Sequence, residues 1–364
     1  MKFKLFFILS ILLSSHAFAQ SYDKNGYRIN IKYPAKAGST IHLAQYYQGQ
    51  TYTVDSTRFS SSGIAVFNLK DKLADGQYLL YIRPDISIEL LISDQQHTID
   101  IGIDQDDIKN SKISGSKDTE LYWQYLRNNQ IAEEVVSLQN KLFDSQDLSA
   151  KEKDEIEKKI KDEKKKIEGN DLQQLIGKHG NEWFGVFMKG FLPVNIPQEL
   201  STGENVAGYQ QYLKAHFLDN ISFTDPRLWR TVYFPQLIDH YMTGVIEQIP
   251  DTVANYASLL VSKSAGDKFC FEQMLSRLVN SSMQSKLMGM ENVWAKLAED
   301  YIFDKNNPMI TAEQEQEIKN LYEPLKYNRI GMKGQNIRIK DINGDSIDTN
   351  SIQATYTILY FDNR

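Results

Sequence analysis

The spacing of apolar residues changes near Ser116, and this change limits the folds that the chain can adopt. Before Ser116, apolar and polar residues alternate, as at Tyr27, Ile29 and Ile31. Such alternation places one face of a strand on a core and the other in water. Gly-, Ser- and Asp-rich turns separate the alternating runs. The pattern predicts a small antiparallel β-sandwich over residues 20–115.

From Ser116 onward, apolar residues recur at helical spacing instead. We expect residues 116–326 to form an α-helical domain, in which residues 116–169 are a charged helical hairpin and the remainder is a bundle of short helices. Ser149 and Glu152 match a capping box that opens the second helix of the hairpin. Interleaved lysines and acids in that helix favour a solvated face over an anion-binding surface.

Capping residues predict where helices of the bundle begin. Asp225 is expected to be an N-cap, with Pro226 at the first helical position. The helix is expected to continue to Val245, either unbroken or with a break at Pro235. Thr311 is expected to cap the last helix, which runs to Lys326. The helices between them are predicted over residues 253–263, 267–280 and 290–303.

Residues 327–364 return to a strand-like pattern. The dipeptide Asn343-Gly344 predicts a two-residue hairpin turn. The apolar run from Thr355 to Phe361 predicts a buried strand. A segment of this length cannot bury a core of its own, so we expect residues 327–364 to be the incomplete start of a further domain.

The N-terminus has the pattern of a secretory signal peptide. Lys2 and Lys4 precede an apolar run from Leu5 to Leu13, and residues 17–19 follow as small-aromatic-small. The run is shorter than the ~20 residues that span a bilayer, which argues against a membrane anchor. We predict cleavage after Ala19, with residues 1–19 removed and no transmembrane segment in the mature chain.

Composition excludes several function classes. The net charge of −6 argues against nucleic-acid binding. The single cysteine, Cys270, cannot form an intramolecular disulfide and is expected to be a buried apolar residue rather than a reactive thiol. No two of the six histidines are four residues apart, and no phosphate-binding or dinucleotide motif is present. We therefore assign no catalytic, cofactor-binding or metal-binding residue. The prominent aromatic residues, expected to fill cores or interfaces, are Tyr46, Tyr47, Tyr122, Trp123 and Trp229.

The order of these regions resembles a group of exported thioredoxin-like proteins (TlpA/ResA and AhpC/TSA type) of the Gram-negative cell envelope. In that group a β-sandwich domain of unknown function and a helical domain of unknown function precede a C-terminal thioredoxin-like domain. The resemblance implies that residues 327–364 are the truncated α/β start of that last domain. The family's Cys-x-x-Cys would follow Phe361, so the chain ends before it. The resemblance is carried by residues 74–78 with 92–94, 225–228 with 233–234, 286–294, and 330–331 with 341–344 and 355–362.

Two functions follow as hypotheses. In the first, the chain is the N-terminal portion of an envelope thiol–disulfide oxidoreductase, located in the periplasm or cell envelope, with other envelope proteins as disulfide substrates. The 364-residue chain would then be inactive by itself, because it lacks the cysteine pair. In the second, it is a non-catalytic exported interaction protein that uses the surfaces of its sandwich and its helices.

Overall fold

The structure is a computed structural model of the chain, and it divides into two units. The first contains the described residues up to Leu192 together with Arg230–Val232; the second contains Pro193–Trp229 and the described residues from Tyr233 onward. The predicted signal peptide lies outside the described residues. The described residues are 26–84, 86–93, 97–144, 148–303, 310–327, 329, 332, 335–358 and 360.

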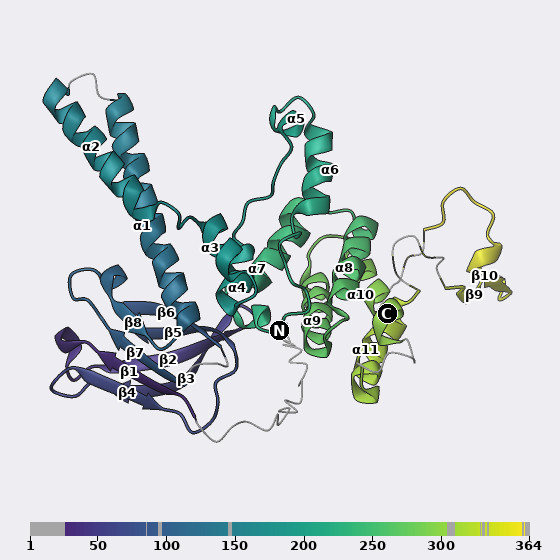
Figure 1. Cartoon of the computed structure of the whole chain (residues 1–364). Helices are drawn as coiled ribbons and strands as arrows, with labels where there is room; N and C mark the ends of the chain where they lie inside the picture. The colour runs from purple at the N-terminus through teal and green to yellow at the C-terminus, as the bar shows by residue number, and fades with distance from the viewer. Residues whose placement is uncertain are drawn as a thin grey trace. The chain divides into compact units, whose positions relative to one another are not determined.

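The first unit opens with two four-stranded sheets, which confirm the predicted β-rich N-terminal region (Figure 1). One sheet has the order β4-β1-β7-β8 and the other the order β3-β2-β5-β6. Each sheet is rich in antiparallel pairs, as expected from the alternating sequence pattern. The strands are β1 (Arg28–Lys32), β2 (Thr40–Tyr47), β3 (Gln50–Arg58), β4 (Ile64–Asn68), β5 (Gly76–Ile82), β6 (Ile86–Ile92), β7 (Thr98–Gly102) and β8 (Lys112–Ser114).

One strand pair departs from the predicted antiparallel arrangement. β1 and β7 are parallel, with Ile29 opposite Ile99 and Ile31 opposite Ile101. Both strands alternate in the same way, and all four of these isoleucines are buried. Alternation shows which face of a strand is buried but carries no information on the direction of its neighbour. The sequence pattern therefore could not reveal this pair.

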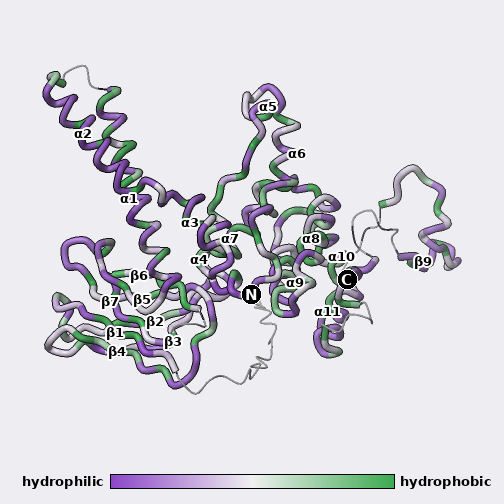
Figure 2. The backbone as a smooth tube through the Cα atoms, in the orientation of Figure 1, coloured by the Kyte–Doolittle hydropathy of each residue, from purple (hydrophilic) through white to green (hydrophobic). Residues whose placement is uncertain are grey.

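In its described residues, the first unit continues with helices α1 to α4. α1 and α2 pack side by side as the predicted hairpin (Figure 1). The capping box is confirmed: Ser149 Oγ accepts from the backbone N–H of Glu152 at 3.3 Å, and Glu152 Oε2 accepts from the backbone N–H of Ser149 at 2.9 Å. No side chain of α2 is buried, and the helix is mostly hydrophilic in Figure 2. The helices are α1 (Lys117–Asp144), α2 (Ala150–Ile167), α3 (Leu172–His179) and α4 (Trp183–Lys189).

The second unit is mainly helical, as predicted. Its core includes the fully buried side chains of Phe234, Ile238 and Met274. Thr311 caps α11 through a capping box with Gln314, which confirms the predicted start of that helix. Short π-helical turns extend α7 and α10. The helices are α5 (Gln198–Ser201), α6 (Val206–His216), α7 (Tyr233–His240), α8 (Pro250–Ser264), α9 (Lys268–Gln284), α10 (Glu291–Leu297) and α11 (Ala312–Leu325).

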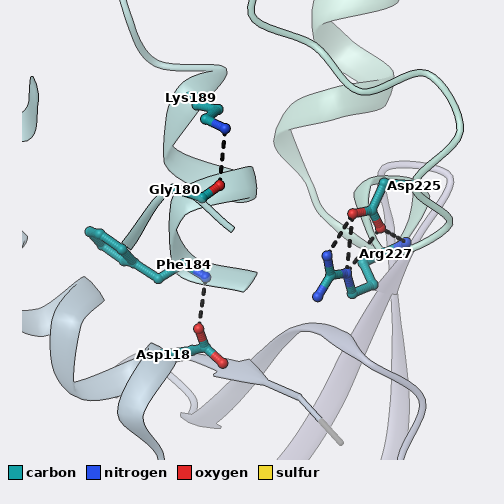
Figure 3. A network of polar contacts seen from close by, with 6 residues as sticks. All are labelled: Asp118, Gly180, Phe184, Lys189, Asp225 and Arg227. Atoms are coloured by element: carbon teal, nitrogen blue, oxygen red, sulfur yellow. Dashed lines mark hydrogen bonds and ion pairs between the residues drawn. The ribbon is translucent and has the colours of Figure 1, made fainter. Parts of the chain in front are cut away.

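The helix predicted to start at Pro226 does not begin there. Asp225 accepts from the backbone N–H of Arg227 at 3.0 Å and forms an ion pair with the Arg227 guanidinium at 2.6 Å (Figure 3). The carboxylate thus closes a turn that leads into a short 3-10 segment, and α7 starts only at Tyr233. Pro235 lies in the first turn of α7, where its missing N–H costs no helical hydrogen bond.

The C-terminal region differs from two further predictions. Strands β9 (Arg338–Lys340) and β10 (Ser346–Asp348) form the expected antiparallel hairpin. Residues 341–345 connect them, so the predicted two-residue turn is wrong. The Asp341 carboxylate accepts the backbone N–H groups of Asn343 and Asp345, and Gly344 has a φ of 88°, which suits glycine.

The buried strand predicted from Thr355 to Phe361 is not formed by its described residues. Thr355–Ile358 and Tyr360 belong to no strand and are exposed. Tyr356 and Ile358 have exposed fractions of 88% and 91%. A strand requires partner strands, and among the described strands β9 and β10 pair only with each other. The predicted Ile330-Gly331 start, Leu359 and Phe361 lie outside the described residues.

Candidate functional site

The single cysteine does not form a site. Cys270 has an exposed fraction of 0%, which confirms its predicted burial. Its backbone N–H donates to the Asp267 carboxylate at 2.8 Å, as part of the N-cap of α9. Among the described residues, no cluster of three His, Cys, Asp or Glu side chains is placed to hold a metal ion, and no helix is long and apolar enough to cross a membrane.

The start of α1 docks against the edge of β6, within the first unit. β6 pairs with β5 alone among the described strands. Thr119 Oγ1 accepts from the backbone N–H of Leu91 at 3.0 Å and donates to the Leu91 carbonyl at 2.9 Å. One helical turn later, the Trp123 indole N–H donates to the Glu89 carbonyl at 3.0 Å. These two side chains satisfy backbone groups that a neighbouring strand would otherwise bind.

The buried carboxylate of Asp118 also fixes the start of α1. Asp118, with an exposed fraction of 6%, accepts from the Ser93 hydroxyl at 2.6 Å. It also accepts from the backbone N–H of Phe184 at 2.8 Å (Figure 3). Asp118 therefore joins the end of β6, the first turn of α1 and the first turn of α4. The Lys189 ammonium donates to the Gly180 carbonyl at 2.9 Å and ties α4 to the turn before it.

A second carboxylate lies on the face of the sheet that α1 covers. Glu89 Oε2 accepts from the Gln77 amide at 2.7 Å and from the Tyr122 hydroxyl at 3.0 Å. Glu89 Oε1 has the Tyr46 hydroxyl at 3.5 Å. The Gln77 side chain is buried, and its oxygen accepts from the backbone N–H of Val232 at 3.1 Å. Glu89 is thus held by neutral donors, and no Lys, Arg or His in the described part of the chain pairs with it.

The two tyrosines of this network stay protonated at ordinary pH. Burial raises the pKa of Tyr46 to about 12, and the negative charge of Glu89 adds to the effect. Burial also raises the pKa of Tyr122, again with a contribution from Glu89. Both hydroxyls are therefore hydrogen-bond donors to the carboxylate.

A groove of about 370 Å³ lies beside this network, between β6 and the first half of α1. Of its two acidic lining residues, Glu89 is half-buried, whereas Glu133 is exposed and accepts from the Asn129 amide at 2.8 Å. Tyr122 and Trp123 contribute aromatic surface. We therefore consider this groove the candidate site for ligand binding. The described lining residues are Ser87, Glu89, Ile108, Tyr122, Trp123, Leu126, Asn129, Gln130 and Glu133.

Sequence reasoning assigned no residue to this site, but it did predict the burial of several of its aromatic side chains. Tyr46, Tyr122 and Trp123 are buried, as expected of core residues. The role of Glu89 was missed, because strand alternation places it on a face expected to meet water. A signal was present: Glu89 is the one charged residue in the mostly apolar run from Ile86 to Ile92.

The comparisons with known proteins reach only part of the chain. No curated protein and no solved structure matches it. Residues 27–122 match a family model described as a domain of unknown function (DUF4369). The matched residues include β1 to β8 and the first turns of α1, so they contain Glu89 and Tyr122 but not Glu133. This region of the chain is therefore similar to a β-rich domain family whose function is not established.

Proposed function

We propose that this chain is the N-terminal, binding portion of an exported thioredoxin-like thiol–disulfide oxidoreductase. The supporting observation is the order of its parts: a region that matches a domain of unknown function, then helices, then a short β-hairpin. This is the order expected from the resemblance described above. In this proposal residues 327–364 are the start of the thioredoxin-like domain.

The division of chemical roles follows from the cysteine content. Thiol–disulfide exchange requires a thiolate that can reach the sulfur of its substrate. Cys270 is buried in α9 and has no second cysteine in the sequence to form a pair. The β-rich and helical parts would bind and orient a substrate protein, and the cysteine pair would lie in sequence that follows residue 364.

The test is to read the gene beyond the codon for Arg364 and to assay its full product for insulin reduction. We expect a Cys-x-x-Cys within a few residues and activity that is lost when either cysteine is changed to alanine. The 364-residue chain should show no turnover, and Cys270→Ala should change nothing. A stop codon directly after Arg364 would overturn the proposal.

We further propose that the protein is exported to the periplasm or cell envelope and is cleaved after Ala19. The supporting observations are the basic start, the apolar run and the small residues Ala17 and Ala19. The expected result is an envelope fraction containing protein whose intact mass corresponds to a start at Gln20. Replacing Ala17 and Ala19 with phenylalanine should leave the uncleaved precursor. Cytoplasmic protein that retains Met1 would contradict the proposal.

A second candidate function is that of a non-catalytic exported binding protein. The groove with its two carboxylates favours it, because binding there needs no cysteine. The same gene reading separates the two candidates, since a stop codon after Arg364 leaves only the second.

A further inference from the structure

The charge of the groove is unbalanced. Glu89 is half-buried and its partners Gln77, Tyr46 and Tyr122 are neutral. Glu133 adds a second negative charge, and none of the described lining residues is a Lys, Arg or His. Two carboxylates beside a partly desolvated cavity favour a cation, because charges interact more strongly there than in bulk water.

The walls of the groove suit a long basic side chain. Tyr122 and Trp123 present aromatic surface, and Ile108 and Leu126 present apolar surface. Lysine and arginine bury their methylene stems on such surfaces and keep the charged head beside acids. The volume of about 370 Å³ is at the lower end of the ~300–1,000 Å³ range of ligand sites, which fits one side chain better than a large molecule.

The edge of β6 next to the groove is open. In an antiparallel strand, the N–H and C=O of alternate residues point to the same side. The backbone groups of Leu91 face Thr119 of α1, and the Glu89 carbonyl faces Trp123. By the same alternation, the backbone N–H and C=O of Ser87 point to that edge of β6. Ser87 is exposed and lines the groove, and no contact with α1 or another described strand occupies its outward backbone groups.

We propose that this groove binds an extended segment of a partner protein, which pairs with the edge of β6 at Ser87 and inserts a Lys or Arg side chain toward Glu89 and Glu133. Main-chain pairing supplies affinity, and the acidic groove supplies selectivity for a basic residue. The open backbone at Ser87 favours a peptide over a free amine, which would use only the carboxylates. The inference rests on the proposed binding function but not on redox activity.

The test uses the mature chain, residues 20–364, in calorimetric titrations. The probes are a blocked pentapeptide Thr-Val-Lys-Val-Thr, the same peptide with glutamate in place of lysine, and n-butylamine. We expect saturable binding of the lysine peptide that weakens with salt, no binding of the glutamate peptide, and binding of butylamine at least about tenfold weaker.

Variants locate the site. Glu89→Gln should weaken the binding of the lysine peptide about tenfold, and Glu133→Gln should weaken it about threefold. Glu120→Gln is the matched control, because Glu120 is an exposed acid of α1 outside the groove, and it should change nothing. Ser87→Pro removes the outward backbone N–H of this residue, and an edge strand tolerates such a proline. The variant should bind the lysine peptide more weakly but bind butylamine unchanged.

Circular dichroism checks that each variant is folded. If Glu89→Gln is unfolded, then Glu133→Lys decides, because a reversed charge at this exposed position should abolish binding. Equal binding of both peptides, or unchanged binding by Glu133→Lys, would overturn the inference. Butylamine that binds as tightly as the peptide would overturn the role of the strand edge. None of these outcomes bears on whether a cysteine pair follows residue 364.

Discussion

The two ends of the helical hairpin are stabilised in different ways. The first turns of α1 bury five side chains, Asp118, Thr119, Leu121, Tyr122 and Trp123, whereas the rest of α1 buries only Val135 and α2 buries none. The start of α1 is held by hydrogen bonds to β6 and α4. The outer hairpin relies on a capping box and exposed ion pairs such as Lys159–Glu134. Helices with similar local sequence signals can therefore contribute very differently to global stability.

The largest expected effect comes from Asp118→Ala. The substitution leaves the backbone N–H of Phe184 without its acceptor and removes the acceptor of the Ser93 hydroxyl. We expect the free energy of unfolding to fall by about 3 kcal/mol. Urea unfolding followed by circular dichroism measures the change. Glu120→Ala in the same helical turn is the control and should shift the midpoint little, so equal losses in both variants would contradict the assigned role of Asp118.

A smaller loss is expected from Thr119→Val. Valine has a similar shape but leaves the backbone N–H of Leu91 without its acceptor, whereas the Leu91 carbonyl keeps the Ser116 hydroxyl as a donor at 3.1 Å. The free energy of unfolding should fall by about 2 kcal/mol, whereas Thr119→Ser should retain most of the stability. The same urea titration compares the two. Serine keeps the hydroxyl and loses only the methyl group, so a serine variant as unstable as the valine variant would contradict the role assigned to the hydroxyl.

Ser149→Ala should act only on the outer hairpin. Loss of the N-cap destabilises the first turn of α2 by about 1 kcal/mol. Hydrogen exchange should become faster at the amides of α2 and remain unchanged in β5 and β6. The global unfolding midpoint should stay the same, and a shifted midpoint would mean that α2 unfolds together with the sheets.

The smallest expected change is a loss of stability near pH 10, as the free energy of unfolding falls with rising pH. Tyr46 and Tyr122 bind their protons more tightly in the folded state than in the unfolded state, because burial raises both pKa values. Their contribution to the free energy of unfolding is fully present below pH 10, the unfolded pKa. It is lost as the pH rises toward 12, the folded pKa of Tyr46. Urea midpoints at pH 8 and pH 10.5 measure this slope. Tyr46→Phe and Tyr122→Phe should each reduce it, and an unchanged slope in the double variant would assign it to other groups.

Local features of the fold were predictable from sequence. Alternation at Ile29 and Ile31 marked a strand, and the Ser149–Glu152 pair marked a helix start, because both signals lie within a few residues. The sequence around Asp225 also contained a local signal, but the Arg227 side chain binds the same carboxylate and a turn forms instead. Propensity decides such cases only when no neighbour competes for the capping group.

The long-range features were not predictable in the same way. The pairing of β1 with β7 joins residues about seventy positions apart, and the Glu89–Tyr122 hydrogen bond joins residues 33 positions apart. Polar side chains in these positions are indistinguishable from solvated ones until the tertiary contacts are known. The candidate groove therefore emerged from the structure, although the burial of its aromatic walls was anticipated.

The docking of α1 on β6 also affects how this region can be divided or synthesised. The backbone groups of Leu91 and Glu89 are satisfied by residues that follow them in the chain by 28 and 34 positions. During translation the edge of β6 stays open until Trp123 has left the ribosome, and such an edge can pair with another nascent chain. A fragment that stops at residue 115 would keep that edge permanently, so its solubility depends on a helix that lies outside the strands themselves.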